Sequence, residues 1–285
     1  MTEKKEKNTE VLVNKIIAFS SVDGPGNRTA IFLQGCNFDC YYCHNPETIN
    51  LCNHCGHCVS VCPVGALDMS DGFVNWNEEL CRSCDKCIEV CEQSSSPRIK
   101  RMNVDQIVKK VKKTRPFISG VTVSGGEASL QTDFLEEFFG EIKKLELSTF
   151  LDTNGSILLK DKKKLLNNLD MAMIDLKSFR SSEHMRLTGI DNSNVIENIK
   201  FMARIGKLYE IRTVIVPGVL DNEFNVDHTS KLLAGLDQKI RYKLIKYRPV
   251  GVRSERIESY SPEQEYMERL GSLARANGCK NIVLV

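Results

Sequence analysis

Eleven of the twelve cysteines lie between Cys36 and Cys91, and their spacing divides them into three sets. The first cysteine set is Cys36, Cys40 and Cys43, in the order C-x3-C-x2-C. Three thiolates this close together can bind three irons of a four-iron cluster and leave the fourth iron open to a small molecule. On spacing alone, a zinc site completed by His44 or by a distant residue is the alternative.

The other eight cysteines form two units with the same C-x2-C-x2-C-x3-C spacing, which is an internal duplication. Bacterial ferredoxins show this run, and in them the fourth cysteine of each unit binds the cluster of the other unit. The crossed pattern predicts two ligand sets: Cys52, Cys55, Cys58 and Cys91 for one cluster, and Cys81, Cys84, Cys87 and Cys62 for the other. A zinc ribbon is the alternative. The pattern leaves open whether such clusters relay electrons or serve as a docking and folding module.

Further along the chain, several short motifs carry groups that could bind a ligand. In Ser124–Glu127 (SGGE), two glycines permit a close backbone approach to a ligand and the glutamate supplies an acceptor, with a plain turn as the alternative. Asp152–Gly155 (DTNG) and Asp175–Lys177 (DLK) are also candidate ligand-binding motifs. The alternative for DTNG is an ordinary turn, and the alternative for DLK is a surface salt bridge. Arg212 stands among β-branched residues, where it needs a carboxylate partner. The carboxylate of a ligand would supply one, and a structural ion pair is the alternative.

These motifs follow apolar runs that predict strands. The expected strands span residues 28–35, 120–124, 148–152, 171–176, 210–216 and 242–247, with a last apolar run at 281–285. Helical patterns separate them, and one begins at Asn103, which can form a capping box with Gln106. Strands that alternate with amphipathic helices predict a parallel sheet. About six such units indicate a partial or full β/α barrel, with a flat doubly wound sheet as the alternative. In a barrel, the motifs would meet at the C-terminal ends of the strands.

The composition limits the class of protein. A chain of 285 residues with 41% hydrophobic residues fits one main domain with an elaboration. The net charge of +2 does not suggest a nucleic-acid or membrane partner, and no apolar run is long enough to cross a membrane. The N-terminal MTEKKEKNTE has no apolar segment of a secretory signal, so we expect a cytoplasmic protein whose cysteines bind metal. Cys279 stands alone and is expected to be a buried, inert thiol.

The first cysteine set, with the aromatic Tyr42 before its last member, resembles the signature of the radical S-adenosylmethionine superfamily. The strings Asp23–Arg28 (DGPGNR) and Cys43–Asn45 (CHN) resemble the narrower signature of glycyl radical enzyme activases, of the pyruvate formate-lyase-activating type. Together with the duplicated units, the chain resembles the YjjW-like branch, whose members carry a two-cluster ferredoxin insert.

The resemblance implies an α/β fold, namely a partial (β/α)6 TIM-like radical S-adenosylmethionine barrel with an inserted bacterial ferredoxin-like 2×[4Fe–4S] domain. Residues 1–14 would be a flexible N-terminal tail, residues 15–49 and 99–285 the core barrel, and residues 50–98 the insert. The implied cofactors are three [4Fe–4S] clusters and S-adenosylmethionine.

The same resemblance implies an oxidoreductase. It would reductively cleave S-adenosylmethionine at the open cluster to a 5′-deoxyadenosyl radical, which takes a hydrogen from a backbone glycine of a partner enzyme. The implied partners are that glycyl radical enzyme and an electron donor, flavodoxin or ferredoxin. A radical enzyme acting on a small molecule and a ferredoxin-type electron-transfer protein are the alternatives.

The resemblance also assigns roles to residues outside the ferredoxin units. The expected catalytic residues are Cys36, Cys40, Cys43, Asp175 and Lys177. The expected cofactor-binding residues are Tyr42, Cys43, His44, Gly125, Gly126, Glu127, Asp152, Thr153, Asp175, Leu176, Lys177, Arg212 and Arg248. The Gly-Gly-Glu motif would bind the amino group of the methionine moiety and Arg212 its carboxylate. Arg248 stands where many activases have histidine.

Overall fold

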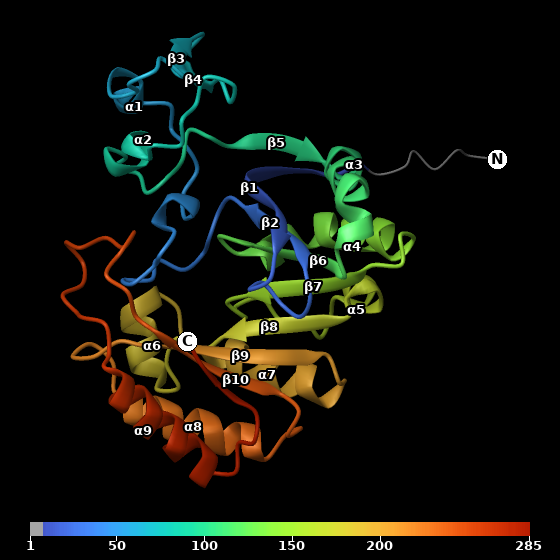
Figure 1. The fold of residues 1–285 in the computed structure, drawn as a ribbon, viewed down its shortest axis with the longest axis vertical. Coiled ribbons are helices and arrows are strands. Elements are labelled where there is room, and N and C mark those ends of the chain that lie inside the picture. The colour runs from blue at the N-terminus through green and yellow to red at the C-terminus, as the bar shows by residue number, and fades with distance from the viewer. Residues whose placement is uncertain (1–7) are drawn as a thin grey trace.

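The computed structural model describes residues 8–285, and a nine-stranded sheet forms its core (Figure 1). The strand order is β11-β10-β9-β8-β7-β6-β2-β1-β5. Neighbouring strands from β2 to β11 are parallel, whereas β1 is antiparallel to both β2 and β5. The strands are β1 Glu10–Ser20, β2 Arg28–Leu33, β5 Lys100–Asn103, β6 Gly120–Gly125, β7 Ser148–Thr153, β8 Met171–Asp175, β9 Leu208–Ile215, β10 Arg241–Lys246 and β11 Ile282–Leu284.

The parallel strands follow one another in chain order without a reversal, as in a barrel, whereas a doubly wound sheet reverses its order. The prediction of an α/β fold with a parallel sheet is confirmed, and each strand expected from the sequence is present within two residues at either end. The sheet stays open, with β11 and β5 at its two edges.

Helices connect successive parallel strands. They are α3 Val104–Thr114, α4 Thr132–Lys143, α5 Lys163–Asn168, α6 Ser181–Thr188, α7 Ser193–Arg204, α8 Asn222–Ala234 and α9 Gln264–Ala276, with 3-10 turns η1 Pro46–Thr48, η2 Arg115–Phe117 and η3 Ala128–Gln131. Helix α3 begins with the expected capping box between Asn103 and Gln106. Its buried residues recur every three or four positions, so one face packs on the sheet.

The prediction of a flexible N-terminal tail over residues 1–14 is wrong for residues 10–14. Strand β1 begins at Glu10 and pairs with both β2 and β5, so residues 10–14 belong to the sheet. Val11 and Val13 are buried there, because alternate side chains of a strand point to the same face. Of the remaining residues of the expected tail, residues 8 and 9 precede the strand and residues 1–7 lie outside the described residues.

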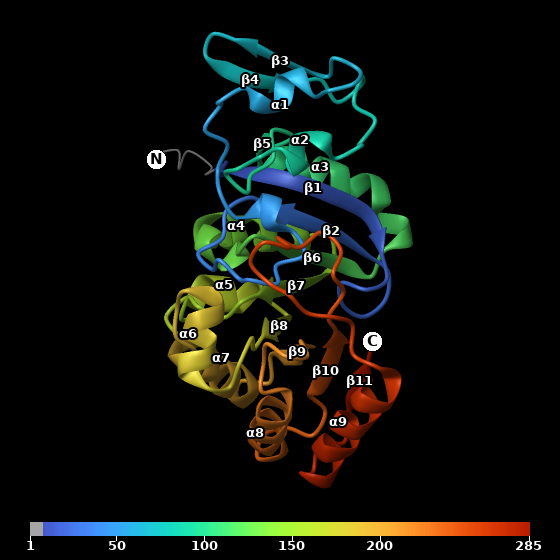
Figure 2. The ribbon, with the colours of Figure 1, turned by 90° about the vertical axis from the view of Figure 1, so that its left-hand side faces the viewer.

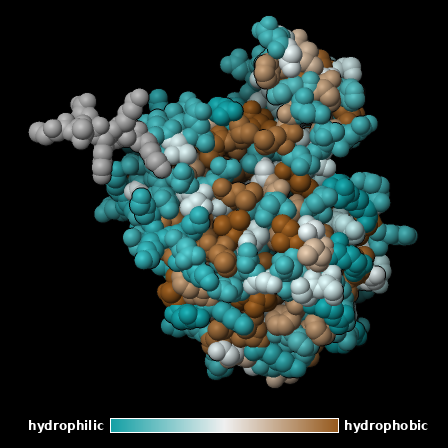
Figure 3. Space-filling view, turned by 180° about the vertical axis from the view of Figure 1, so that it is seen from behind, coloured by the Kyte–Doolittle hydropathy of each residue, from teal (hydrophilic) through white to brown (hydrophobic). Residues whose placement is uncertain are grey.

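The cysteine-rich segment between η1 and β5 stands above the sheet as a separate small unit (Figures 1 and 2). It contains α1 His57–Ser60, β3 Leu67–Ser70, β4 Phe73–Trp76 and α2 Lys86–Glu89, and β3 and β4 form their own two-stranded sheet. Its small hydrophobic core contains Cys58, Leu67, Val74 and Cys87. On the back of the molecule, hydrophobic residues gather just below this unit (Figure 3). None of the helices within residues 8–285 is long and apolar enough to cross a membrane.

Arg28 braces the first three parallel strands at their N-terminal ends. Its side chain is 1% exposed, and its guanidinium donates to the Thr122 hydroxyl at 2.9 Å and to the carbonyls of Val121 and Ser148 at 2.7 and 3.1 Å. The guanidinium also lies 4.1 Å from the ring centre of Phe150. The last residue of the DGPGNR string therefore joins β2, β6 and β7 at the end opposite to the cysteine loop.

Candidate metal and cofactor site

The first cysteine set lies in a loop that leaves the C-terminal end of β2. The returning segment closes this loop, since the Cys36 amide donates to the Ile49 carbonyl and the Gly35 amide to the Thr48 carbonyl, both at 2.9 Å. On the other side, the Asp39 amide donates to the carbonyl of Thr188 in α6 at 3.0 Å. Backbone bonds therefore hold the loop from two directions.

The thiols of this loop are largely withdrawn from water. Burial raises the pKa of Cys36 and of Cys40 to about 12, and it also raises the pKa of Cys43. Such thiols keep their protons unless a metal replaces them. The Phe38 amide lies 3.4 Å and the Asn154 side-chain amide 3.9 Å from the sulfur of Cys36, so donors already face a sulfur that would carry negative charge. The donor set therefore fits an iron–sulfur cluster.

The loop after β10 covers the cysteine loop (Figure 2). Arg253 pairs with Asp39 at 2.6 Å and donates to the Cys40 carbonyl at 2.9 Å, and Arg256 also pairs with Asp39. Burial alone would raise the pKa of Asp39, but these two arginines outweigh burial and lower that pKa. We name this contact the arginine latch. Its residues were not expected at the site, because no local motif in the sequence marks them.

The glycines of the SGGE motif are explained by the chain's own backbone. At Gly125, φ is +121° and a Cβ would lie 2.1 Å from the Leu33 nitrogen. At Gly126, a Cβ would lie 2.1 Å from the Gly35 carbonyl oxygen. These glycines therefore permit a close approach to the end of β2. This contact within the chain explains both glycines without a ligand.

Glu127 connects this motif to the next strand end. Its carboxylate is 2% exposed and accepts hydrogen bonds from the Ser129 amide at 2.8 Å, the Thr153 hydroxyl at 2.6 Å and the Asn154 amide at 2.6 Å. Burial raises the pKa of Glu127, although these donors oppose the shift. The structure thus brings Glu127 together with the DTNG motif, whose Asn154 reaches the sulfur of Cys36.

Arg212 in β9 has carboxylate partners within the chain. Its guanidinium donates to both carboxylate oxygens of Asp152 at 2.9 Å and to Glu210 at 2.7 Å. Carboxylates of the chain itself therefore supply the partner that Arg212 needs, and its binding of a ligand's carboxylate stays a prediction. Asp152 also accepts from the Ser124 hydroxyl at 2.9 Å, so two of the expected site motifs meet here.

Asp175 and Lys177 form an ion pair at the end of β8, with 2.7 Å between the carboxylate and the ammonium nitrogen. Burial alone would lower the pKa of Lys177, but Asp175 and the Cys40 thiol raise it well above its usual value. The pKa of Asp175 is lowered, because Lys177 and Arg212 outweigh the effect of burial. This pair is therefore charged and lies near the first cysteine set.

Three other expected cofactor-binding residues lie outside the network of hydrogen bonds and ion pairs described above. Tyr42 is buried in a small apolar cluster, and its hydroxyl has no hydrogen-bond partner among the described residues. Leu176 is buried in the main core. Arg248 has an exposed side chain, and its carbonyl lies 3.0 Å from the Nε2 atom of His44.

In the small unit above the sheet, two cavities separate the eight cysteines into groups. The first cavity is lined by Cys52, Cys55, Cys58, Cys87 and Cys91. The second is lined by Cys62, Cys81, Cys84 and Cys87. Apart from Cys87, which borders both, these groups match the crossed ligand sets expected from the spacing. Within residues 8–285, no three or more His, Cys, Asp or Glu side chains are gathered to bind a single metal ion.

A large groove separates this unit from the sheet. Its lining reaches from Cys81 and Cys91 to His44 and Gly125 near the first cysteine set. The loop after β10 contributes residues 250–255 to the same groove. The groove therefore connects the surface of the cysteine-rich unit with the entrance to the cysteine loop.

Comparison with known proteins identifies the family. The model of the radical SAM superfamily matches residues 30–227, which include the cysteine loop and the strands β6 to β9. This chain belongs to the radical SAM superfamily. Membership implies a [4Fe–4S] cluster and S-adenosylmethionine, and the buried thiols after β2 fit the cluster.

Curated relatives resemble the chain over most of its length. The pyruvate formate-lyase-activating enzyme of Streptococcus mutans is 28% identical over 249 residues, which are 84% of this chain and 78% of the relative. The indoleacetate decarboxylase activating enzyme of Tractidigestivibacter scatoligenes is 28% identical over 307 residues, which are 96% of this chain and 97% of the relative.

Solved structures share the fold of this radical SAM protein. A domain of a pyruvate formate-lyase-activating enzyme from Bacteroides vulgatus has a TM-score of 0.51 at 22% identity, covering 59% of this chain and 99% of that domain. A radical SAM methyltransferase from Sphaerobacter thermophilus has a TM-score of 0.55 at 14% identity, covering 90% of this chain and 66% of the methyltransferase.

Proposed function

We propose that this protein is the activating enzyme of a glycyl radical enzyme. The observation that carries the proposal is the likeness to an activating enzyme over 96% of the chain, with the first cysteine set held in a closed loop at the C-terminal edge of the sheet. When bound, the reduced cluster would supply the electron that cleaves S-adenosylmethionine, and the resulting radical would take a hydrogen from a backbone glycine of the partner.

Cys36, Cys40 and Cys43 would bind this cluster, and the surrounding residues would orient the cosubstrate. Glu127 presents a buried carboxylate near the DTNG motif, where it would accept from the amino group of the methionine moiety. The charged network of Asp152 and Arg212 supports a binding role for both residues, because it joins β7 and β9 across the intervening β8, whose last residue Asp175 pairs in register with Arg212. In this role Arg212 would exchange part of its contact with Asp152 for the cosubstrate's carboxylate.

The ion pair of Asp175 and Lys177 would hold charge close to the cluster. Both side chains are mostly buried, and the proximity of Lys177 to Cys40 favours negative charge on that sulfur. His44 lines the large groove and lies 3.0 Å from the Arg248 carbonyl, which supports a place for both residues beside the cosubstrate. Excluding water would strengthen each of these contacts.

The cysteine-rich unit would be a ferredoxin-like insert with two further [4Fe–4S] clusters, giving three in total. The two cavities support this proposal, since each is bordered by one complete crossed set of four cysteines. The electron donor would be a flavodoxin or a ferredoxin, and the protein substrate a glycyl radical enzyme.

Anaerobic reconstitution followed by reduction with dithionite tests the function. The wild-type protein should convert S-adenosylmethionine to 5′-deoxyadenosine and methionine, and Cys43→Ala should not. Cys279→Ala is the matched control, because this buried cysteine packs in the main core and should leave cleavage unchanged. Adding the partner glycyl radical enzyme should give a glycine-centred signal in electron paramagnetic resonance. Cleavage that persists in Cys43→Ala would refute the assignment of the reactive cluster.

A further inference from the structure

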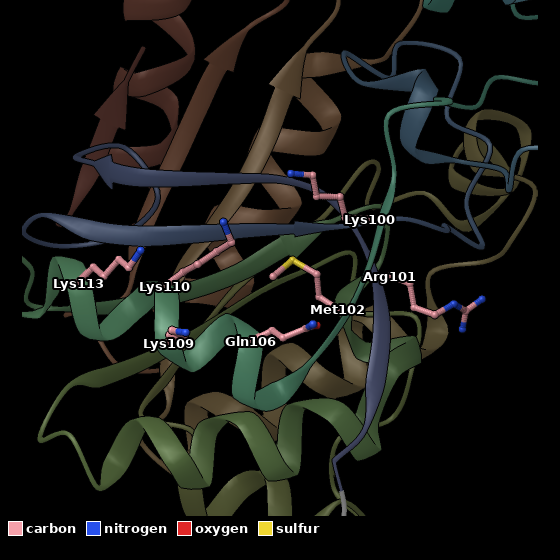
Figure 4. A pocket seen from close by; sticks show the side chains of 7 residues that line it. All are labelled: Lys100, Arg101, Met102, Gln106, Lys109, Lys110 and Lys113. Atoms are coloured by element: carbon pink, nitrogen blue, oxygen red, sulfur yellow. The ribbon is translucent and has the colours of Figure 1, made fainter. Parts of the chain in front are cut away.

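An open groove rich in lysine lies between β5 and α3 (Figure 4). We name it the basic groove, and its residues are Lys100, Met102, Gln106, Lys109, Lys110 and Lys113. Arg101 borders the groove but points away from the lysines of α3 in Figure 4, and it pairs with Glu10 at 3.6 Å. No step of the proposed reaction uses these residues.

The lysines of α3 are available to a partner. Lys109, Lys110 and Lys113 are exposed, and none of them takes part in a salt bridge with the described residues. Helix α3 has a single acidic residue, Asp105, in its first turn. The overall charge of the chain is only +2, so this surface concentrates positive charge that the rest of the molecule offsets.

The basic groove continues to the cysteines of the second unit. Lys100 lies over the ring of Trp76, with its ammonium 5.2 Å from the ring centre. Trp76 in turn lines the cavity bordered by Cys62, Cys81, Cys84 and Cys87. Lys100 and Lys110 also line the large groove that reaches Cys81. A protein seated on the lysines would therefore lie beside this cavity.

We propose that the basic groove docks an acidic one-electron carrier protein of the flavodoxin or ferredoxin class, and that the electron enters through the cluster of Cys62, Cys81, Cys84 and Cys87. The proposal rests on the proposed function. In the step, the reduced carrier loses one electron and the insert cluster gains it, and no bond to the protein forms or breaks. Complexes with such electron carriers have small interfaces and depend on complementary charge, which the exposed lysines would supply.

A nucleic acid is the less favoured occupant. Single strands bind where aromatic side chains stack on bases, and none of the residues that line the basic groove is aromatic. A carrier needs only complementary charge and a redox centre nearby, both of which this surface offers.

The test compares the reconstituted wild-type protein with Lys110→Glu/Lys113→Glu. The neutral pair Lys110→Gln/Lys113→Gln is the second variant, because Lys113 lies in the last turn of α3 and a glutamate there also weakens the helix. Lys163→Glu/Lys164→Glu is the matched control, with the same change of charge on exposed residues of α5. Binding of an oxidised acidic flavodoxin is measured by surface plasmon resonance across a salt series. Stopped-flow absorbance follows cluster reduction by the reduced flavodoxin and by dithionite.

We expect affinity and reduction rate at low salt to fall on the order of tenfold or more in the glutamate variant, less in the glutamine variant, and not in the control. The salt dependence should flatten, and reduction by dithionite should stay unchanged. Equal binding and equal rates in wild type and glutamate variant would overturn the proposal, as would an equal loss in the control. Binding of an unstructured oligonucleotide that is lost with the same variant, while flavodoxin binding is kept, would assign the groove to nucleic acid instead. Failure of the proposed function would appear separately, as a wild-type protein that is reduced but does not cleave S-adenosylmethionine.

Discussion

Replacing Arg212 by alanine should lower the stability of the fold. The guanidinium is the cation that faces Asp152, whose remaining contact is the Ser124 hydroxyl, whereas Glu210 keeps Arg241 at 3.3 Å. The main loss is therefore one buried carboxylate left without its cation. Breaking a buried pair in this way costs about 3–5 kcal/mol. At roughly 2–4 °C per kcal/mol for chains of this size, the apparent melting temperature should fall by about 6–20 °C.

The assay is anaerobic thermal unfolding of the reconstituted protein, with titration of the reduced cluster by S-adenosylmethionine. Arg269→Ala is the matched control, because Arg269 pairs with Glu223 at 2.9 Å on the surface and such pairs contribute at most about 1 kcal/mol. In the double variant Arg212→Met/Asp152→Asn, part of the lost stability should return, since neither charge is then left alone.

A fall in melting temperature no larger than that of Arg269→Ala would refute this reasoning. If the same Arg212→Ala protein also bound S-adenosylmethionine much more weakly, the guanidinium would act mainly as a ligand for the cosubstrate. If the protein melts early and binds normally while folded, Arg212 acts through the ion pair with Asp152.

Three further predictions follow from the cysteine loop and the insert. Replacing the first cysteine set by alanine should remove roughly a third of the iron from the reconstituted protein, measured by chemical analysis, together with all cosubstrate cleavage. Cys84→Ala/Cys87→Ala should remove one insert cluster but leave most dithionite-driven cleavage, and a folded variant without such cleavage would contradict the separation of insert and core. Arg253→Ala should loosen the arginine latch and speed the bleaching of the cluster's absorbance in air, with Arg269→Ala as the unaffected control. Because the pKa of Asp39 is lowered in the folded protein, the latch stabilises the fold above the unfolded pKa of about 3.9. This stabilisation is lost only as the pH falls through the lower folded pKa. The difference in bleaching rate between Arg253→Ala and the wild type should therefore stay constant between about pH 6 and 9.

Local patterns were sufficient to predict most of the fold. The apolar runs and the Asn103–Gln106 capping box depend on neighbours in the sequence, and they predicted strands and helices closely. Strand β1 was missed because its first residues follow a charged segment. The alternation of Val11 and Val13 was the signal that could have revealed it.

The candidate site likewise combines features that depend on local sequence with contacts between distant parts of the chain. The cysteine spacing is local. Apart from Cys87, which borders both cavities, the cysteines that line them fall into the crossed sets that the spacing predicts, and their role as cluster ligands stays a prediction. The arginine latch joins residues more than 200 positions apart, so no window of sequence could show it. The contact of Arg212 with Asp152 likewise depends on the strand order of the sheet, in which β8 separates the strands of these two residues. The sequence predicted that the glycines of the SGGE motif permit a close approach of the backbone. Only the strand pairing reveals that they approach the end of β2.

The arginine latch also orders events during synthesis. The Arg253 side chain that binds the Cys40 carbonyl is made 213 residues after that cysteine. At about 5–20 residues per second, the ribosome needs roughly 10–40 s to reach it. Until then, the segment that later covers the cysteine loop does not exist. The nascent chain therefore offers its first cysteine set to iron–sulfur delivery before the last quarter of the protein can close over it.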